Sequence, residues 1–279
     1  MPTVTSKDGT SIAYSRVGSG PPTILVDGAL CWRQQGPNAG LAEKLADHFT
    51  VYTYDRRGRG ESGDTPPFNT MREIEDLEAL INEVGGSAFV YGISSGATLA
   101  LDAAASGLAI AKLAIFEPPH FVDDTRPPLP EGYQTRLEDL VKADERGKAV
   151  KLFMTEGINL PSLMVGMMRL MPAWRKLKSI AHTLPYDVSF VVEAQQGKPL
   201  SSSRWSAVTV PTLAVVGGKS PKWMHNGVRA TASVLPNAKY FVLEGEMHIV
   251  KPKALAPVLT EFFANEMTPN GRWDDPFAA

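Results

Sequence analysis

The sequence has little of what a disulfide-bonded or nucleic-acid-binding protein needs. Cys31 is the only cysteine among 279 residues, so no disulfide can form within the chain and the fold does not depend on an oxidising compartment. The net charge is −2 at pH 7, and no run of Lys or Arg is dense enough to follow a phosphate backbone. Arg56, Arg57 and Arg59 form a basic cluster that Gly58 interrupts, and we interpret it as a turn beside a strand rather than a phosphate site.

Long apolar segments are also missing. The first ten residues are polar and lack the apolar core of a secretory signal. The longest weakly charged stretch, residues 92–111, contains Asp102 and several Ser and Gly residues, which favours a buried helix and its turns over a membrane span. We therefore expect a cytoplasmic protein, a monomer or homodimer, with a small-molecule substrate and with neither a membrane nor a nucleic acid as partner.

Metal ligands are few. The five histidines are scattered along the chain, and the lone cysteine has no second thiol near it. Because a metal site needs several such side chains close together, we expect no metal and no organic cofactor. A nucleophilic thiol at Cys31 is also disfavoured, since this residue follows an apolar strand with no helix start behind it, and a buried bystander explains it better.

Alternating strand and helix patterns dominate the two ends of the chain. This alternation is the signature of a mostly parallel sheet covered on both faces, and 279 residues suffice for one large α/β domain with an inserted lid. Strands are predicted over residues 4–6, 11–17, 23–26, 51–54, 88–91, 112–116, 212–216 and 239–243. Helices are predicted over residues 40–48, 71–84, 95–105, 223–234 and 252–265, and the last residues, 268–279, are expected to form a tail.

The alternation breaks between these two ends. Residues 117–204 are rich in Pro and in helical patterns and show no clear strand. We interpret this segment as an inserted helical cap. The predicted division is a core of residues 1–117 and 205–279 with a cap of residues 118–204.

Residues 92–96 read Gly-Ile-Ser-Ser-Gly and match the G-x-S-x-G nucleophile elbow, between a predicted strand and a predicted helix. The sharp turn forces the central serine into a sparsely populated backbone conformation, so small neighbours are needed on both sides. Ser94 would project above the sheet as a nucleophile. The N–H of Ser95 would start the helix, where free amides and the helix dipole favour an oxyanion.

A serine hydroxyl needs a base within hydrogen-bond reach, and histidine is the usual one. His248 follows the last predicted strand and precedes the final helix, so its loop lies above the carboxyl edge of the sheet. It is the leading candidate. His48 and His225 are better explained as solvated or capping residues, whereas His120 and His182 belong to the cap, from which either could contact substrate.

Four features carry a resemblance to a known family: Ser94, His248, the pair Asp27-Gly28 and the loop 55–62 (Asp-Arg-Arg-Gly-Arg-Gly-Glu-Ser). Through them the sequence resembles the α/β-hydrolase superfamily from about residue 4 to residue 263. The resemblance implies an α/β-hydrolase fold, with a mostly parallel eight-stranded sheet flanked by helices and an inserted helical cap. It implies little about the substrate.

The resemblance also bears on the acid of a catalytic triad. In many relatives this acid follows the seventh strand in a Gly-x-x-Asp pattern, but residues 217–220 read Gly-Gly-Lys-Ser here. Other branches, haloalkane dehalogenases among them, carry it just after the sixth strand, where Glu117 stands. Glu117 is therefore the predicted acid. Alternatively it only caps the turn that follows it, in which case Asp123 or Asp124 takes the role.

The oxyanion hole of the family uses a backbone N–H in the loop after the third strand. By resemblance the donor is Ala29, paired with Ser95. Relatives often have histidine where Asp27 stands. Because a carboxylate near a developing oxyanion is unfavourable, we expect the Asp27 side chain to turn away and bond to backbone.

The predicted cap holds a group of flexible apolar side chains. Most of them are expected to pack the cap against the core, while some could line an acyl or alkyl pocket. The group comprises Met154, Met164, Met167, Met168, Met171, Phe153 and Trp174. The candidates for substrate binding are Trp32, Met154, Met168, Trp174 and His120.

Taken together, these residues predict hydrolysis of a small, largely apolar ester, thioester or lactone through an acyl-enzyme on Ser94. Two alternatives stay open. One is a different reaction on the same triad, such as amide or carbon–carbon bond hydrolysis or perhydrolysis. The other is a non-catalytic ligand receptor that keeps the pocket.

Overall fold

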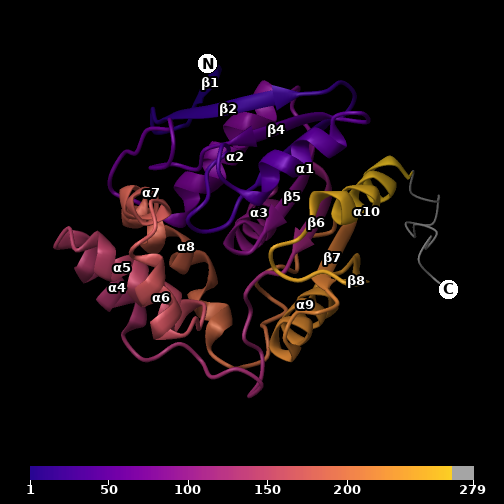
Figure 1. The fold of residues 1–279 in the computed structure, drawn as a ribbon. Helices are drawn as coiled ribbons and strands as arrows, with labels where there is room; N and C mark the ends of the chain where they lie inside the picture. The colour runs from indigo at the N-terminus through magenta and orange to yellow at the C-terminus, as the bar shows by residue number, and fades with distance from the viewer. Residues whose placement is uncertain (266–279) are drawn as a thin grey trace.

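The computed structural model describes residues 1–265, so the tail expected over residues 268–279 lies outside the described residues. An eight-stranded sheet runs through the molecule in the order β1-β2-β4-β3-β5-β6-β7-β8 (Figure 1). The strands are β1 (Thr3–Thr5), β2 (Ser11–Val17), β3 (Pro22–Val26), β4 (Thr50–Tyr54), β5 (Ala88–Ile93), β6 (Ile110–Phe116), β7 (Thr212–Gly217) and β8 (Ala238–Leu243). The predicted mostly parallel eight-stranded sheet is confirmed.

Only the first two strand pairings, β1 with β2 and β2 with β4, are antiparallel. The turn between β1 and β2 contains Asp8, whose Oδ1 accepts the N–H of Thr10 at 3.0 Å, and Gly9, whose φ of 87° suits a residue without a Cβ. From β4 to β8 every pairing is parallel, so the carboxyl ends of these strands share one edge.

Helices cover both faces of the sheet, because alternate side chains of the central strands point to opposite faces. In β3, Ile24 and Val26 belong to one apolar cluster, together with residues of α2 (Thr70–Glu83), α3 (Ser95–Ala105) and α9 (Lys222–Val234). Leu25 belongs to a second cluster, with residues of α1 (Pro37–Leu45) and α10 (Pro252–Ala264). The continuous apolar runs of these strands therefore serve two cores rather than one.

One helix lies away from its predicted range. The sequence pattern predicts a helix over residues 40–48, whereas α1 spans Pro37–Leu45. Proline is favoured at the first helical position, since its fixed φ is helical and the N–H that it lacks would be unpaired there. Pro37 occupies this place, and the apolar spacing of Leu41 and Leu45 did not reveal it.

Between β6 and β7 the described chain forms helices and loops and no strand. The inserted helices, as we call α4–α8, are α4 (Tyr133–Lys142), α5 (Arg146–Leu152), α6 (Ser162–Met168), α7 (Ala173–Ser179) and α8 (Leu184–Val191). Shorter helical turns cover Phe153–Gly157, Ala181–Thr183 and Val192–Gln195. The division at residues 117/118 and 204/205 stays a prediction.

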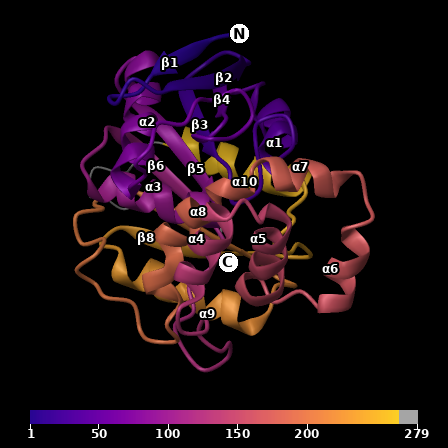
Figure 2. The same ribbon diagram turned by 90° about the vertical axis from the view of Figure 1, so that its left-hand side faces the viewer.

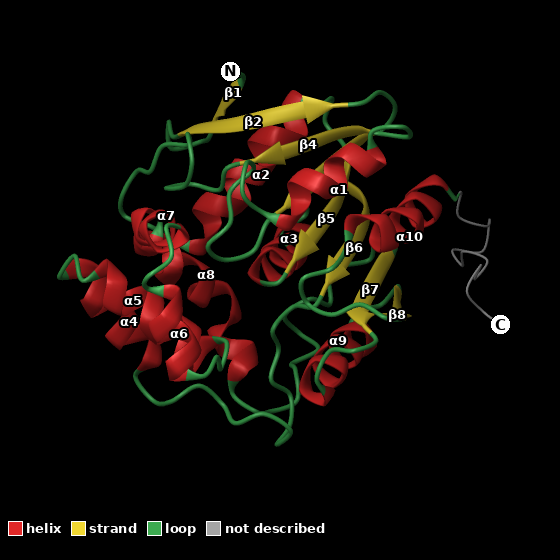
Figure 3. Cartoon of the chain, viewed as in Figure 1, coloured by secondary structure: helices red, strands yellow, loops and turns green. Residues whose placement is uncertain are grey.

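The inserted helices lie beyond the carboxyl edge of the sheet. In Figure 3 the arrowheads of β4 and β5 point toward them, and in Figure 2 they lie in front of the sheet. They have an apolar cluster of their own, with Leu137, Val150 and Leu184 at its centre. Ala29 and Leu30, in the loop after β3, pack against that cluster, so the helices contact the core beside this loop.

Candidate active site

Ser94 lies in the turn between β5 and α3, with φ 57° and ψ −128°. A residue with a side chain rarely adopts this conformation. The backbone on both sides of it is closely packed: a Cβ on Gly92 would lie 2.5 Å from the carbonyl oxygen of Gly96, and a Cβ on Gly96 would lie 2.5 Å from the carbonyl oxygen of Asp27. Larger residues cannot occupy either glycine position without moving the backbone.

Glu117 leaves the neighbouring strand at the same level as Ser94. Ile93 and Phe116 are register partners, and the N–H of Ser94 donates to the carbonyl of Phe116 at 2.9 Å. Glu117 is fully buried and, like Ser94, has a positive φ, 48°. Two residues that follow adjacent parallel strands are thus brought to one point, as happens at the carboxyl edge of α/β sheets.

Three donors surround the carboxylate of Glu117. Its Oε1 accepts the N–H of Gly217 at 2.8 Å and the hydroxyl of Ser220 at 2.5 Å. Its Oε2 lies 2.8 Å from Nδ1 of His248. A buried carboxylate requires such partners. Residues 217–220, which lack the acid found in many relatives, instead supply donors to an acid on the next strand.

His248 lies in the loop between β8 and α10, and its side chain is 45% exposed. Because Nδ1 faces the carboxylate, the arrangement favours the tautomer with the proton on Nδ1 and leaves Nε2 as the acceptor. Within residues 1–265 no hydrogen bond joins Nε2 to the hydroxyl of Ser94. Such catalytic hydrogen bonds are often long in the absence of substrate and tighten when it binds.

The two alternative acids lie elsewhere. Asp123 accepts hydrogen bonds from Thr125 and from the side chain of Asn226, the latter at 2.6 Å. Asp124 is exposed. In the described part of the chain, neither carboxylate contacts His248, whereas Glu117 does.

Two backbone donors were predicted for an oxyanion. The N–H of Ser95 belongs to the first turn of α3, and Ala29 is half-buried in the loop after β3. Gly28 holds this loop against the elbow, since a Cβ there would lie 2.9 Å from Cβ of Ser94. The loop and the elbow are therefore in van der Waals contact.

The Asp27 side chain turns toward the start of α1, as expected. A Cβ on Gly36 would lie 2.8 Å from both carboxylate oxygens, and the carboxylate accepts the backbone N–H of Asn38. Burial raises the pKa of Asp27 to about 7, although nearby Arg59 and the Asn38 N–H act in the opposite direction. Below that pH the group is mostly neutral, which lessens the conflict with an oxyanion.

The arginine cluster after β4 is a turn, as predicted, but its side chains are not exposed. Arg56, Arg57 and Arg59 are each about 1% exposed and form buried ion pairs. Arg56 pairs with Glu73 of α2 at 2.5 Å, and Arg57 pairs with Asp76 of the same helix at 2.7 Å.

The two acids of α2 that pair with these arginines are buried as well. The helical spacing places Glu73 and Asp76 mostly off the apolar face, which suggests solvent, yet both are about 1% exposed. Burial raises the pKa of Asp76 to about 6, and Arg57 partly offsets this. Charged residues of opposite sign reach the interior only in pairs, and a pattern of hydrophobicity does not reveal the pairing.

Cys31 is half-buried, and burial raises the pKa of its thiol to about 12. A thiol with so high a pKa stays protonated at neutral pH and is a poor nucleophile. The structure is consistent with the view of Cys31 as a bystander.

Four of the five candidate substrate-binding residues lie in or against the apolar cluster beyond the sheet, or in the loop after β3. Met154 and Trp174 are buried in the apolar cluster of the inserted helices, and Met168 packs against that cluster. Trp32 is half-buried in the loop after β3. These four residues are apolar and belong to the segment between β6 and β7 or to the loop after β3 that contacts it.

His120 does not lie on a pocket wall. It is fully buried, with Nε2 at 3.1 Å from the hydroxyl of Thr98 and Nδ1 at 2.8 Å from that of Thr231, and it stacks on Trp205 with ring centroids 5.2 Å apart. Burial lowers its pKa to about 3. With both nitrogens engaged and no exposed surface, His120 is a core residue, and its place among substrate-binding residues is corrected.

Three methionines of the cap group are exposed: Met164, Met167 and Met171 are 44%, 59% and 56% exposed. These three lie on or just after α6, whose only buried residue is Val165. The other four members belong to the apolar cluster or pack against it: Met154, Met168, Phe153 and Trp174.

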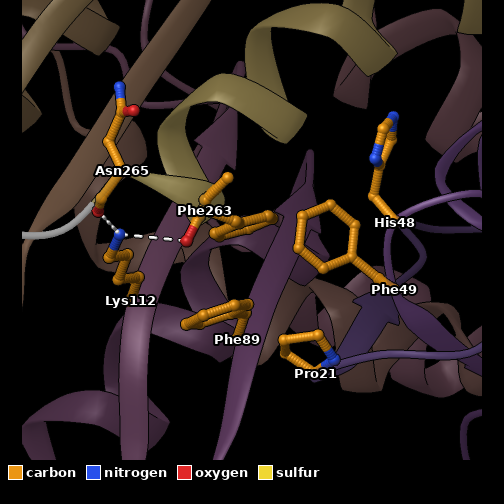
Figure 4. Close-up of a pocket in the computed structure, with 8 residues that line it drawn as sticks. Pro21, His48, Phe49, Phe89, Lys112, Phe263 and Asn265 are labelled. Atoms are coloured by element: carbon orange, nitrogen blue, oxygen red, sulfur yellow. Dashed lines mark hydrogen bonds between the residues drawn. The ribbon is translucent and has the colours of Figure 1, made fainter.

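A groove of about 490 Å³ lies at the opposite edge of the sheet (Figure 4). Phe89 and Lys112 line it, near the amino ends of β5 and β6, and Phe263 closes it with a ring stacked on Phe89 at 5.0 Å. The ammonium of Lys112 donates to the carbonyl of Phe263 at 3.0 Å. Ser94 and Glu117 follow the other ends of the same two strands, so this groove is not the candidate active site.

Two further kinds of feature are absent from residues 1–265. No group of three or more His, Cys, Asp or Glu side chains there is arranged to hold a metal ion. Likewise, none of the helices in this part of the chain has the length and apolar character needed to cross a membrane.

A model of the alpha/beta hydrolase family matches residues 18–258. The chain is 52% identical to an alpha/beta hydrolase from Sphaerobacter thermophilus DSM 20745, whose solved structure it matches with a TM-score of 0.86 over 94% of this chain and 100% of that one. A thermophilic esterase from Thermogutta terrifontis matches with a TM-score of 0.65 at 21% identity, over 94% of this chain and 97% of that one, and shares the fold alone.

A curated relative, the uncharacterized hydrolase YraK of Bacillus subtilis (strain 168), is 34% identical over 102 residues. The match spans 34% of this chain and 35% of that protein. It therefore adds support for a hydrolase only over about a third of either chain.

Proposed function

The chain belongs to the alpha/beta hydrolase family, and we propose that it is a serine hydrolase that cleaves a small, largely apolar ester, thioester or lactone through an acyl-enzyme on Ser94. The observation that carries the proposal is the contact of Glu117 with His248 across 131 sequence positions, beside the strained Ser94. Ser94, His248 and Glu117 come from three separate loops at one edge of the sheet, and in this proposal they are the nucleophile, the base and the acid.

The reaction would begin with attack of the Ser94 hydroxyl on the carbonyl carbon. Nε2 of His248 takes the serine proton, and Glu117 stabilises the imidazolium through Nδ1. The negative charge that develops on the carbonyl oxygen is held by the N–H groups of Ala29 and Ser95. Collapse of the tetrahedral intermediate expels the alcohol, thiol or lactone oxygen, which receives the proton from His248.

Deacylation repeats these steps with water. His248 removes a proton from the water molecule, the resulting tetrahedral intermediate is held by the same two N–H groups, and the acid leaves as Ser94 regains its proton. The donors on Glu117 support this cycle, because a carboxylate fixed by Gly217 and Ser220 holds the imidazole in one orientation.

The inserted helices would form the cap over this site. Their apolar cluster contacts Ala29 and Leu30, next to the proposed oxyanion donor. Met154, Met168, Trp174 and Trp32 are the proposed lining of an acyl or alkyl pocket. A lining of this kind favours substrates with little charge.

A fluorophosphonate probe tests the proposal directly, because it reacts with an activated serine. The wild-type protein should be labelled, and Ser94→Ala should not be. A panel of p-nitrophenyl esters of increasing chain length, with lactones and amides beside them, then identifies the substrate class. Absence of labelling in a folded wild-type protein would favour a ligand receptor, and turnover of amides alone would favour a different reaction on the same triad.

A further inference from the structure

Arg59 contacts the proposed oxyanion loop directly. Its Nη1 donates to the carbonyl oxygen of Gly28 at 2.7 Å and, more weakly, to that of Cys31 at 3.4 Å. The side chain is about 1% exposed, so these hydrogen bonds are not shared with solvent. The guanidinium therefore lies on the carbonyl side of the peptide group that joins Gly28 to Ala29.

That peptide group is also the one that carries the proposed donor. The carbonyl of Gly28 and the N–H of Ala29 belong to one planar unit and point in opposite directions. A donor fixed on the carbonyl consequently fixes the direction of the N–H. Because the hydrogen bond is charge-assisted, it also draws electron density from the amide and makes its N–H a stronger donor.

Asp187 of α8 holds Arg59 in this position. One carboxylate oxygen, Oδ2, accepts from Nη2 of Arg59 at 2.5 Å. The other, Oδ1, accepts the hydroxyl of Ser95 at 2.7 Å and Nη1 of Arg56 at 2.6 Å. Burial alone raises the pKa of Asp187, but Arg59 and Arg56 outweigh it and keep this carboxyl below its ordinary pKa, and thus ionised.

We infer that Arg59 and Asp187 are positioning residues of the oxyanion hole, and this inference rests on the function proposed above. A single carboxylate from the inserted helices binds the residue that supplies one donor, Ser95, and the arginine that orients the other, Ala29. Neither side chain touches the substrate. The inserted helices thus help to assemble the hole in addition to covering it.

The four ion-paired side chains of this cluster carry balanced charges, and because burial raises the pKa of nearby Asp27 to about 7, its carboxyl adds less than one full negative charge at neutral pH. Arg56 and Arg59 carry two positive charges, and Glu73 and Asp187 carry two negative ones, all about 1% exposed. A buried cluster with excess negative charge would oppose the oxyanion. A cluster with balanced charge orients the Gly28–Ala29 peptide group without opposing the oxyanion.

Arg59→Gln tests the inference, with Arg57→Gln as the matched control. Both arginines lie in the same loop, are equally buried and pair with a buried aspartate, but Arg57 bonds to Asp76 and Asp8 and does not contact the oxyanion loop. On an ester substrate we expect Arg59→Gln to lower kcat by about 10- to 100-fold with KM changed by less than about threefold, since removal of a whole oxyanion donor costs roughly 100- to 1000-fold. Arg57→Gln should keep kcat within about twofold although it also lowers the thermal stability.

A second readout separates positioning from folding. A trifluoromethyl ketone forms a tetrahedral adduct on the serine, so its affinity should fall by about the same factor as kcat/KM in Arg59→Gln. Arg59→Lys and Asp187→Asn protect the test against a variant that does not fold, and both should lie between wild type and Arg59→Gln. If wild type is labelled by the fluorophosphonate and Arg59→Gln behaves as Arg57→Gln does, the inference is wrong and the proposed function stands. If wild type is not labelled, the proposed function itself fails.

Discussion

The two edges of the sheet differ in what their loops contain. At the carboxyl edge, Ser94 and Glu117 have positive φ values, and a fully buried carboxylate is held by three donors. At the amino edge, aromatic rings stack beside the groove of Figure 4, and Lys112, which lines it, bonds to backbone carbonyls. A groove alone therefore marks only an empty volume. Strained backbone together with buried polar side chains is the better indication of a candidate active site.

Glu117→Gln, at the carboxyl edge of the sheet, should lower kcat more than any other substitution considered below. Gln keeps the acceptor for Gly217 but would present an amide where His248 needs a carboxylate, so the imidazolium loses its stabilisation. We expect kcat to fall by about a hundredfold to ten-thousandfold while the protein stays folded, as measured by ester hydrolysis and circular dichroism. Asp123→Asn is the control and should stay near wild type. Near-normal turnover of Glu117→Gln would move the role of acid to Asp123, Asp124 or no residue.

Gly96→Ala should disturb the backbone at the same edge of the sheet. The added Cβ would lie 2.5 Å from the carbonyl oxygen of Asp27, so the elbow and the loop after β3 must separate. We expect a loss of about 1–3 kcal/mol in the free energy of unfolding and a clear drop in kcat. Gly166→Ala in α6 is the matched control, because nothing lies within 4 Å of its Cβ position and helix propensity favours Ala. Equal behaviour of the two variants would contradict the close contact.

His120→Asn should change the pH dependence of stability rather than activity. The pKa of His120 is about 3 in the folded protein and about 6.5 when unfolded, so below pH 6.5 only the unfolded chain takes up the proton. Its contribution is therefore complete above pH 6.5 and falls with pH by up to about 1.4 kcal/mol per unit. Urea unfolding at pH 7, 6 and 5 should show a shallower decline for His120→Asn. Parallel curves would mean that His120 does not titrate on unfolding.

Phe89→Leu at the amino edge should have the smallest effect. It removes the stacking on Phe263 and the edge contact with Phe49, which together cost about 1–2 kcal/mol in stability. The kcat and the chain-length preference on esters should stay within about twofold of wild type, since this ring lies at the other end of β5 from Ser94. A changed substrate preference would give the amino-edge groove a role in binding.

The parts of the molecule that depend on neighbouring residues are predictable from the sequence. Short apolar, β-rich runs predict the strands, and the motif around Ser94 stands out because a predicted strand and a predicted helix flank it. Glu117 could be proposed because it follows the sixth strand, where the resemblance to other branches of the family, the haloalkane dehalogenases among them, places the acid. Its partners Ser220 and His248 are 103 and 131 positions away, and only the fold brings them together.

What the sequence did not show was the pairing of buried charges. Arg59 and Asp187 are 128 positions apart, and each alone is typical of a surface residue. No periodicity marks such a pair, since its position is set by tertiary packing. His120 was misplaced for a related reason: two threonine hydroxyls satisfy it in the core, and neither Thr98 nor Thr231 is near it in sequence.

The contact between Asp187 and Arg59 also has a consequence for how the chain acquires its native state. During synthesis Arg56 and Arg59 leave the ribosome long before residue 187, so until then their guanidinium groups lack this counter-ion. Such charges resist burial, which would keep the loop after β4 hydrated in the nascent protein. Contacts this distant along the chain form late and slowly, and hydrolytic competence would accordingly be among the last properties that the maturing molecule gains.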